Sequence, residues 1–366
     1  MPYNNINLPA YPCDTDIWEK LKKEKRPIVV YGMGNGADKL IERFAKYNIE
    51  IADFFASDGF VRGHLFHGKR VKSFSEIKAE YEDFVIILSF ASNKRDVIEM
   101  LKEISENYEM YIPDMPIANT EEYFDKDFYN EHYSEILAAR DTLFDEESKN
   151  LFDAIVSYKL SAKPEYLFKY TSTKDELYSV LPCYAIESYV DVGAYRGDTL
   201  AEAIRYFKNM KQAVVIEPDP KTFKKLKAFV ETCENVKINL HNAASWSFDG
   251  EGSFSESGNR NSTVNATASF VHNERVVPFV RLDSAVKDKV DFIKYDVEGA
   301  EMEALLGSKR LISDYNPALL VSLYHRSCDL FSIINYFNNE YKGYKFYLRR
   351  LLCLPAWELD LIMIPE

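Results

Sequence analysis

Two aspartates bracket a glycine-bearing turn in the middle of this chain. The run reads Asp191-Val-Gly-Ala-Tyr-Arg-Gly-Asp198, preceded by Tyr189-Val190 and followed by the helix-like run that begins at Thr199. Gly193 and Gly197 let the backbone turn tightly and approach a ligand closely, because they carry no Cβ atom. Strand, glycine turn and helix in this order open a ligand crevice at the carboxyl end of a strand in an α/β sheet.

The charge of this turn indicates which ligand it binds. Carboxylates repel a phosphate and attract a cation, and S-adenosylmethionine carries both an ammonium and a sulfonium. We therefore predict S-adenosylmethionine as the cofactor, bound by Asp191, Gly193, Ala194, Tyr195, Gly197 and Asp198. The alternative is a plain strand-to-helix turn in which Thr199 and Glu202 form a capping box. That alternative explains Thr199 and Glu202 but leaves the paired aspartates without a reason.

Two later strand ends supply further cofactor contacts. The apolar run Ala213-Val-Val-Ile ends at Glu217, and an acid at this place accepts both hydroxyls of a ribose in dinucleotide-binding folds. Asp219 precedes Pro220, which predicts a helix N-cap with proline at the first helical position. After a third strand near residues 236–240, Asn242 could meet the adenine edge beside Ala243, although a turn residue explains Asn242 equally well.

A second charged cluster lies at Lys294, Asp296 and Glu298. Alternate residues of a strand share a face, so these three charges would lie together if the strand continued that far. Burying them without partners would cost several kcal/mol per ion. We therefore expect the strand to end here and the charges to rim a crevice. A solvated, ion-paired strand end is the alternative.

Together these runs resemble the FkbM family of S-adenosylmethionine-dependent methyltransferases. The similarity covers about residues 183–366 and rests on residues 191–198, Glu217-Pro-Asp219, Leu282-Asp283, Lys294-Tyr-Asp-Val-Glu-Gly-Ala-Glu301, Ser322-Leu-Tyr-His-Arg326 and Tyr347-Leu-Arg349. It implies the class I methyltransferase fold, a doubly wound α/β sheet of seven strands with the last strand, 359–364, antiparallel. Members generally methylate hydroxyl groups, often on sugars or polyketide products. Tyr195 stands where the commoner motif has asparagine.

The implied chemistry is an in-line methyl transfer to a hydroxyl, aided by a nearby base. Asp296 and His325 are the candidate bases, because both follow adjacent predicted strands, although a histidine at this position is often only structural. Lys294 would orient Asp296 or hold the acceptor, and Asp296 is also expected to contact the cofactor. We expect Glu298, Arg326 and Asn261 to contact the acceptor. We expect no metal ion. Magnesium or manganese bound by Asp296, Glu298 and His325 is the chemical alternative.

Length and composition favour two domains. The chain has 366 residues, of which 46% are hydrophobic and 28% charged, as in soluble globular proteins. We expect a small Rossmann-like α/β domain at residues 1–118, a helical linker at 119–182 and the methyltransferase domain at 183–366. In the first domain, Gly32-Met-Gly-Asn-Gly-Ala37 follows a strand-like run and satisfies Gly-x-Gly-x-x-Ala. That domain could bind a dinucleotide, bind a nucleotide or sugar nucleotide, or serve in docking.

Charge and cysteine content narrow the partners and the compartment. A formal net charge of −13 speaks against nucleic acid, because no basic surplus is available to neutralise phosphates. Five scattered cysteines without disulfide or metal spacing favour the cytoplasm. We expect no membrane span and no leader segment. The expected partner is a sugar or glycan acceptor, and a homo-oligomer is compatible with the sequence.

One segment and two other functions complete the sequence-based expectations. Residues 250–269 are rich in Ser, Asn, Gly and Thr, which predicts a long loop with a substrate-facing flap near residues 259–263. A non-catalytic sugar-nucleotide-binding or scaffold protein with the same fold is the alternative from another class. An NAD-dependent sugar-modifying enzyme acting through Gly32–Ala37 would need a catalytic Tyr/Lys or Cys pair, which we do not find.

Overall fold

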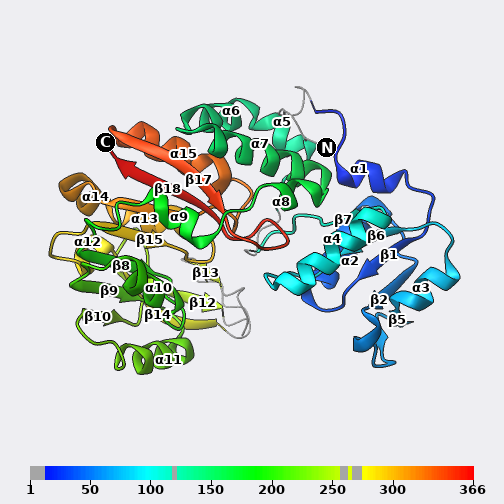
Figure 1. Ribbon diagram of the computed structural model, residues 1–366, viewed down its shortest axis with the longest axis horizontal. Coiled ribbons are helices and arrows are strands. Elements are labelled where there is room, and N and C mark those ends of the chain that lie inside the picture. The colour runs from blue at the N-terminus through cyan, green and yellow to red at the C-terminus, as the bar shows by residue number, and fades with distance from the viewer. Residues whose placement is uncertain (1–12, 118–121, 256–262, 266–273) are drawn as a thin grey trace.

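The computed structural model describes residues 13–117, 122–255, 263–265 and 274–366. Two α/β units lie side by side, the amino-terminal one drawn in blue to cyan and the carboxyl-terminal one in green to red (Figure 1). Helices from the middle of the chain lie between them and against the carboxyl-terminal unit. In the described part of the chain, no helix is both long and apolar enough to cross a membrane.

The amino-terminal unit is built on a five-stranded parallel sheet. Its strands are β1 (Ile28–Tyr31), β2 (Asp53–Ala56), β5 (Lys72–Ser73), β6 (Val85–Leu88) and β7 (Met110–Tyr111), in the order β5-β2-β1-β6-β7. The apolar runs of β1 and β6 are wholly buried, as in parallel strands that are covered on both faces. The connecting and flanking elements are α1 (Ile17–Lys22), α2 (Asn35–Tyr47), η1 (Asp58–Phe60), the hairpin β3 (Leu65–Phe66) and β4 (Lys69–Arg70), α3 (Phe74–Glu80) and α4 (Arg95–Asn107).

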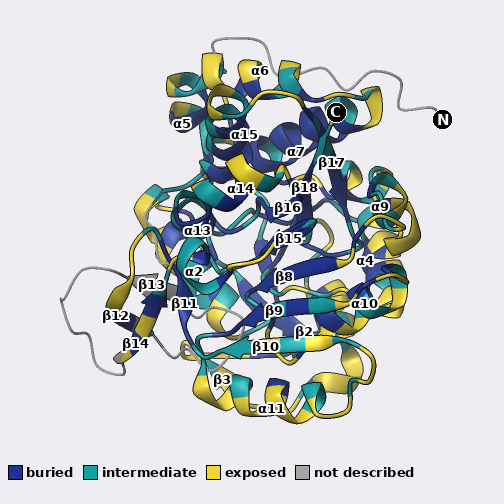
Figure 2. Ribbon diagram, turned by 90° about the vertical axis from the view of Figure 1, so that its left-hand side faces the viewer, coloured by how far each residue is buried: buried dark blue, intermediate teal, exposed yellow. Residues whose placement is uncertain are grey.

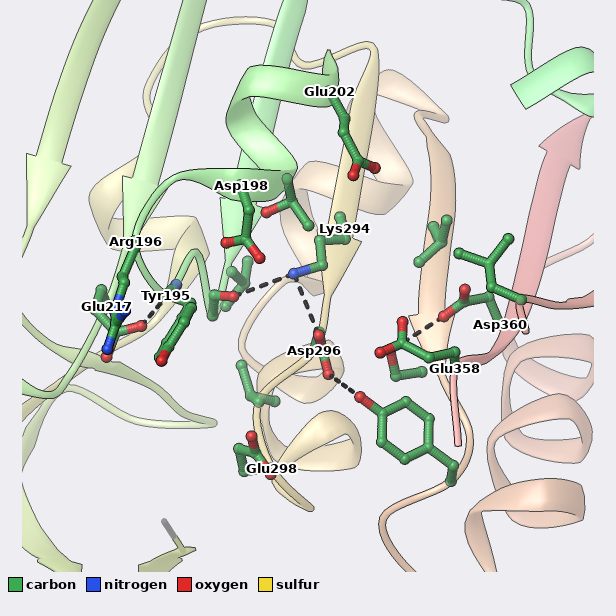
Figure 3. A pocket seen from close by; sticks show the side chains of 18 of the residues that line it. Tyr195, Arg196, Asp198, Glu202, Glu217, Lys294, Asp296, Glu298, Glu358 and Asp360 are labelled. Carbon is green, nitrogen blue, oxygen red and sulfur yellow. Dashed lines mark hydrogen bonds and ion pairs between the residues drawn. The ribbon is translucent and has the colours of Figure 1, made fainter. Parts of the chain in front are cut away.

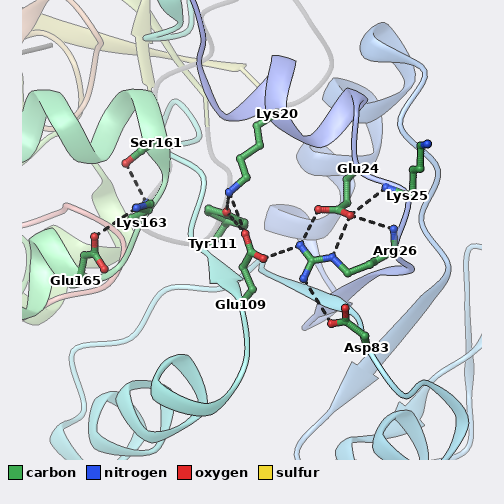
Figure 4. A network of polar contacts seen from close by, with 10 residues as sticks. All are labelled: Lys20, Glu24, Lys25, Arg26, Asp83, Glu109, Tyr111, Ser161, Lys163 and Glu165. Atoms are coloured by element: carbon green, nitrogen blue, oxygen red, sulfur yellow. Dashed lines mark hydrogen bonds and ion pairs between the residues drawn. The ribbon is translucent and has the colours of Figure 1, made fainter.

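A polar network ties the start of this unit to its last strand (Figure 4). The guanidinium of Arg26 lies 2.7 Å from Glu24 and 2.5 Å from Glu109, and Lys20 lies 2.9 Å from Glu109. The hydrogen bond from Arg26 lowers the pKa of Glu24 to about 2. We read this network as structural, because it joins α1 and the start of β1 to β7.

The helices of the middle segment pack on the carboxyl-terminal unit. They are α5 (Lys126–Glu131), α6 (Tyr133–Thr142), α7 (Glu146–Ser161), α8 (Glu165–Lys169) and α9 (Lys174–Val180). On α7, Ser148 accepts the backbone N–H of Leu348 at 2.8 Å, so the helix is bonded to the sheet. One apolar core runs from Val29 through Phe152 to Ile293. This core is shared by all three expected parts of the chain, so the two boundaries expected between them stay a prediction.

The carboxyl-terminal sheet has the expected class I methyltransferase topology. Its strands are β8 (Ser188–Val192), β9 (Gln212–Ile216), β10 (Lys237–His241), β15 (Phe292–Tyr295), β16 (Ala318–Ser322), β17 (Tyr344–Arg350) and β18 (Leu359–Pro365), in the order β10-β9-β8-β15-β16-β18-β17. Strand β18 runs antiparallel to both β16 and β17, whereas the other neighbouring strands of this sheet pair in parallel. The central strands β8, β15 and β16 are buried, and Figure 2 shows them in dark blue. The fold prediction is confirmed.

Helices cover both faces of this sheet, as doubly wound folds require. They are α10 (Asp198–Tyr206), α11 (Pro220–Val230), α12 (Leu282–Ala285), α13 (Glu301–Leu306), α14 (Lys309–Tyr315) and α15 (Asp329–Glu340). Helix α15 packs against α6 of the middle segment, so that segment shares one face of the sheet.

The long loop expected at residues 250–269 is wrong in part. Strands β12 (Gly250–Ser255) and β13 (Thr263–Asn265) form a small sheet with β11 (Ala244–Ser245) and β14 (Glu274–Val280), in the order β11-β14-β12-β13. Gly252 is needed here for space, because a Cβ atom would lie 2.0 Å from the ring of Phe279. Gly252 in β12 therefore leaves room for the ring of Phe279 on the neighbouring strand β14. Asn261 and most of the expected flap lie outside the described residues.

Candidate active site

One cavity of about 790 Å³ lies at the carboxyl edge of the large sheet (Figure 3). Its wall comes from all three parts of the chain: Asn93 and Arg95 at the start of α4, residues of the 171–178 segment, and the ends of the sheet strands. Two backbone hydrogen bonds hold the amino-terminal segment at Asn93 in place. The N–H of Ser92 donates to the oxygen of Leu354 at 2.8 Å, and the N–H of Leu354 donates to the oxygen of Ser92 at 2.9 Å. The amino-terminal unit is thus bonded to the loop beside the cavity.

The glycine turn after β8 needs both of its glycines. Gly193 has a φ of +81°, and a Cβ atom there would lie 1.8 Å from the backbone oxygen of Asp296. Gly197 has a φ of +93°, and a Cβ atom there would lie 2.3 Å from the ring of Phe229. Gly193 therefore packs on the backbone of Asp296, just beyond β15, and Gly197 packs on Phe229 of α11, so a side chain at either position would clash.

The capping-box alternative for this turn is not formed. Helix α10 begins at Asp198 with Gly197 as N-cap and without a side-chain cap. Thr199 instead donates its hydroxyl to Oδ2 of Asp191 at 2.7 Å, and Glu202 pairs with Lys174. Asp191 itself is fully buried and does not line the cavity. Burial raises its pKa, against the opposing charge of Lys294. Asp191 therefore fixes the turn through Thr199 and pairs with Lys294 beneath the cavity wall.

Glu217 lies on the cavity wall at the end of β9, as the ribose prediction requires. Its Oε2 accepts the N–H of Tyr195 and its Oε1 accepts the N–H of Asp219, both at 2.9 Å. Burial raises the pKa of Glu217 to about 7, while the two backbone N–H groups oppose the shift. Each oxygen keeps a lone pair for a further donor. Asp219 accepts the N–H of Thr222 at 2.6 Å and caps α11, which confirms the N-cap prediction.

Some of the residues expected at the cofactor do not reach the cavity. The amide nitrogen of Asn242 donates to the backbone oxygens of Glu217 and Pro218 at 2.8 and 3.1 Å, so its side chain braces the Glu217 loop. Ala243, Ala194 and Gly197 are likewise absent from the wall, where Ala244 and Ser245 stand after β10 instead. The expected residues that do line the cavity are Gly193, Tyr195, Asp198, Glu217 and Asp296.

Lys294 is a buried cation of the site. Its Nζ donates to the backbone oxygen of Gly193 at 3.1 Å and lies 3.5 Å from both Asp191 and Asp296. Burial by itself would lower the pKa of Lys294, but the charges of the two aspartates outweigh it and raise the pKa. The ammonium therefore ties the glycine turn to the acidic cluster, and Figure 3 shows it between them.

Asp296 lies just beyond the end of β15, as predicted, and its carboxylate faces the cavity. It takes a hydrogen bond of 3.2 Å from the hydroxyl of Tyr324. Burial would raise the pKa of Asp296, yet the charges of Lys294 and His325 hold it below its ordinary value. Asp296 is therefore ionised at neutral pH. Glu298 also lines the cavity, has a φ of +54°, and has its pKa raised by burial.

His325 lies beneath the cavity rather than on its wall, with 1% of its surface exposed. Its Nδ1 is 2.9 Å from Glu301, and its Nε2 is 3.4 Å from Glu298 and 3.6 Å from Asp296. Burial opposes the charged imidazole, but the surrounding carboxylates, Glu301 foremost, raise its pKa well above the ordinary value. A protonated imidazole has no lone pair for a proton or a metal ion. This geometry favours His325 as a support for the acidic cluster.

Glu301 was not singled out from the sequence, although it closes the run that begins at Lys294. It is fully buried, and its Oε1 accepts the N–H groups of Val297 and Gly299 at 2.9 and 3.4 Å. It therefore fixes the turn that carries Asp296 and Glu298. One atom each of Asp296, Glu301 and His325 lie within 4.8 Å of one another, but we read this group as an ion-paired cluster.

Arg326, which was expected to contact the acceptor, does not line the cavity. Its backbone N–H donates to Asp329 at 3.1 Å, and its side chain is absent from the wall. Residues that were not expected stand there instead, namely Ser322, Tyr324, Glu358 and Asp360. A signal for Asp360 was present, because the first residues of an antiparallel last strand reach the edge where the parallel strands end.

The sheet order and the glycine turn together define a class I methyltransferase fold. Residues 191–346 match the family described as Methyltransferase FkbM domain, and the carboxyl-terminal part of this chain is therefore an FkbM methyltransferase domain. The FkbM methyltransferase of Methylobacillus flagellatus KT is similar in structure, with a TM-score of 0.67 and 21% identity over 92% of this chain and 90% of that chain. The shared fold thus includes the amino-terminal unit.

More distant structures match only part of the chain. Fibrillarin of Aeropyrum pernix, solved with bound S-adenosyl-L-methionine, has a TM-score of 0.33 and 13% identity over 50% of this chain and 69% of that chain. A Streptococcus thermophilus rRNA methylase has a TM-score of 0.33 and 11% identity over 52% and 92%. Neither similarity is high enough to bear on the fold or the site. No curated protein matches the sequence.

Proposed function

We propose that the protein is an S-adenosylmethionine-dependent O-methyltransferase that acts on a hydroxyl of a sugar, a glycan or a related small molecule. The observation that carries the proposal is that one cavity is lined both by the glycine turn with Glu217 and by the ionised Asp296. In such an arrangement, a cofactor at the turn and an acceptor at Asp296 would meet inside one enclosed space.

The cofactor end fits S-adenosylmethionine in shape and charge. Gly193 lines the cavity, and Asp198 on the same wall offers a carboxylate to the ammonium group. Glu217 keeps one lone pair on each oxygen for the ribose hydroxyls, because each already accepts one backbone N–H. When bound, S-adenosylmethionine supplies a methyl group on a good leaving group.

At the acceptor end, Asp296 would hold and deprotonate the reacting hydroxyl. Lys294 and Tyr324 fix its carboxylate from two sides, so an acceptor hydroxyl meets a preoriented partner. The hydroxyl proton passes to Asp296 as the new oxygen–carbon bond forms. Orientation of this kind is worth about 7–11 kcal/mol in favourable cases, and a positioned base adds about 10²–10⁴ in rate.

His325 and Glu301 would act through Asp296 and not on the acceptor. The protonated imidazole faces two carboxylates of the cavity, and Glu301 keeps it charged and holds the turn that bears them. Both are therefore proposed as positioning residues. All five cysteines are free thiols, which agrees with a cytoplasmic location.

Three measurements test the proposed function. Calorimetry with S-adenosylmethionine should show one site, and labelled S-adenosylmethionine should transfer its methyl group to members of a panel of glycans, glycosides and sugar nucleotides. Carbon NMR of the product should then show a methyl ether. Cofactor binding without transfer to any hydroxyl would favour a binding or scaffold protein. A methylamine or carbon-methylated product would contradict O-methyl transfer.

A further inference from the structure

Asp360 stands in the same row of the sheet as Asp296. Strands β15 and β16 are parallel with Tyr295 opposite Val321, so Asp296 follows in register with Ser322. Ser322 in turn pairs with Asp360 across the antiparallel β16–β18 ladder. Residues in one row point to the same face of a sheet, and neighbouring strands lie about 4.8 Å apart. The two aspartates are therefore about two strand spacings apart and share the cavity, as Figure 3 shows.

The surroundings of Asp360 disfavour the ionised form of its carboxyl group. The side chain is 7% exposed, and Ser322 donates a hydrogen bond of 3.2 Å to its Oδ1. Burial, with the charges of Glu358 and Asp296, raises the pKa of Asp360 to about 8, while Ser322 and Lys294 oppose the shift. An amide would accept the same hydrogen bond without the charge. Acids retained in such places are often functional.

We propose that Asp360 is a second acceptor-binding residue, which holds a hydroxyl next to the one that Asp296 directs to the methyl group. This inference rests on the proposed function and narrows its substrate class to polyols that present two neighbouring hydroxyls. The backbone separation of about 10 Å that two strand spacings give leaves room for a single sugar ring between the two carboxyl groups. A simple alcohol would fill only the Asp296 half.

The other walls around Asp360 agree with a neutral, donor-rich acceptor. Glu358 precedes it on the cavity wall, Tyr178 faces it from the middle segment, and Lys294 approaches from β15. Arg349, its partner on β17, sends its guanidinium to Asp145 at 2.8 Å and so leaves Asp360 uncompensated on that side. An anionic group on the acceptor would meet carboxylates here, whereas hydroxyls meet acceptors of hydrogen bonds.

The test compares Asp360→Asn with wild type and with Asp314→Asn, an exposed control on α14. Methyl α-glucoside, methyl α-mannoside and myo-inositol serve as acceptors, each beside its matched monodeoxy analogues. We expect Asp360→Asn to lower kcat/KM at least tenfold on the best polyol and to leave S-adenosylmethionine affinity unchanged. Removing the neighbouring hydroxyl should cost wild type a similar factor. The variant should lose little more on that analogue, because the same contact is already gone.

Thermal unfolding separates this role from a structural one. The variant has no carboxyl group to ionise, so it should unfold at a higher temperature than wild type at pH 9 and by a smaller margin at pH 6, because the raised pKa of Asp360 penalises wild type increasingly as the pH rises from the ordinary carboxyl range to about 8. A lower unfolding temperature at both pH values would make Asp360 structural and overturn the inference, as would unchanged kinetics. If wild type binds the cofactor yet methylates no polyol, the proposed function fails and this inference with it. Normal activity in both proteins overturns the inference alone.

Discussion

Oε1 of Glu301 lies 2.9 Å from Nδ1 of His325, and both side chains are buried. The other imidazole nitrogen faces Glu298 and Asp296, which line the cavity. A buried carboxylate and a carboxylate pair on the wall thus enclose one cation. This arrangement explains how two acids stay close together at the acceptor end, since the imidazolium reduces their mutual repulsion.

Neutralising Glu301 should release the charge on His325. In Glu301→Gln we expect the pKa of His325 to fall, which carbon NMR of labelled histidine would report. The stabilisation from protonated His325 is complete below its ordinary pKa of 6.5 and is lost as the pH rises through the higher pKa of the folded state. The variant should therefore lose stability at a lower pH than wild type. An unchanged histidine titration would contradict the pairing.

Removing the Asp296 charge should slow the chemistry and spare the cofactor. Asp296→Asn keeps the shape of the side chain, so we expect turnover to fall by about 10²–10⁴ with nearly unchanged S-adenosylmethionine affinity. Asp314→Asn, an exposed carboxylate with an ion pair of 3.6 Å, is the matched control. If Asp296→Asn kept more than a tenth of the wild-type turnover, another group would have to be the base.

Glu217 should matter for the cofactor alone. We expect Glu217→Ala to weaken S-adenosylmethionine binding at least tenfold, about 1.4 kcal/mol, because two hydrogen bonds to the ribose would be lost. Glu231→Ala, at the exposed end of α11, controls for a general effect of removing an acid. Calorimetry decides the matter, and equal affinities for the two variants would refute the ribose assignment.

Gly193 can be tested against a glycine with the same backbone strain. Gly343 has a φ of +76°, close to the +81° of Gly193, but a Cβ atom there would meet open space. Gly343→Ala should therefore cost only about 1–2 kcal/mol for the left-handed conformation. Gly193→Ala should cost more and abolish cofactor binding, because its Cβ would clash with the backbone at Asp296. Equal unfolding free energies would contradict this packing.

Chelation should leave the enzyme unaffected. Both imidazole nitrogens of His325 face carboxylates, and its raised pKa leaves no lone pair for a metal ion at neutral pH. We expect dialysis against EDTA to change neither cofactor affinity nor turnover. Loss of turnover that magnesium or manganese restores would turn Asp296, Glu301 and His325 into ligands.

Much of the fold could be predicted from local patterns in the sequence. The turn at Gly193, the strand end before Asp296 and the cap at Asp219 all depend on residues near one another in the chain. Their steric and hydrogen-bonding requirements are local, so the residue types alone indicate them. The run Lys294–Glu301 was specific enough to indicate the methyltransferase family as well.

Tertiary structure decided which of these residues reach the cavity. Asp191 and His325 sit at the expected strand ends, yet both are buried beneath the wall, because side-chain direction depends on packing from elements far away in sequence. The composition of residues 250–269 indicated a loop, but Gly252 lies in β12 and makes room for the ring of Phe279.

The start of the last strand indicated the sheet edge for Asp360, but strand pairing alone placed it beside Asp296. It joins Asp296 by way of Ser322 across two ladders, one parallel and one antiparallel, and no sequence spacing encodes that register. Arg95 likewise reaches the cavity because the amino-terminal unit is bonded to the loop at Leu354. The sequence by itself determined the fold class and the chemistry of its motifs, since these follow from local sterics and charge. The acceptor end was decided by long-range pairing, which brings distant carboxylates to one edge of the sheet.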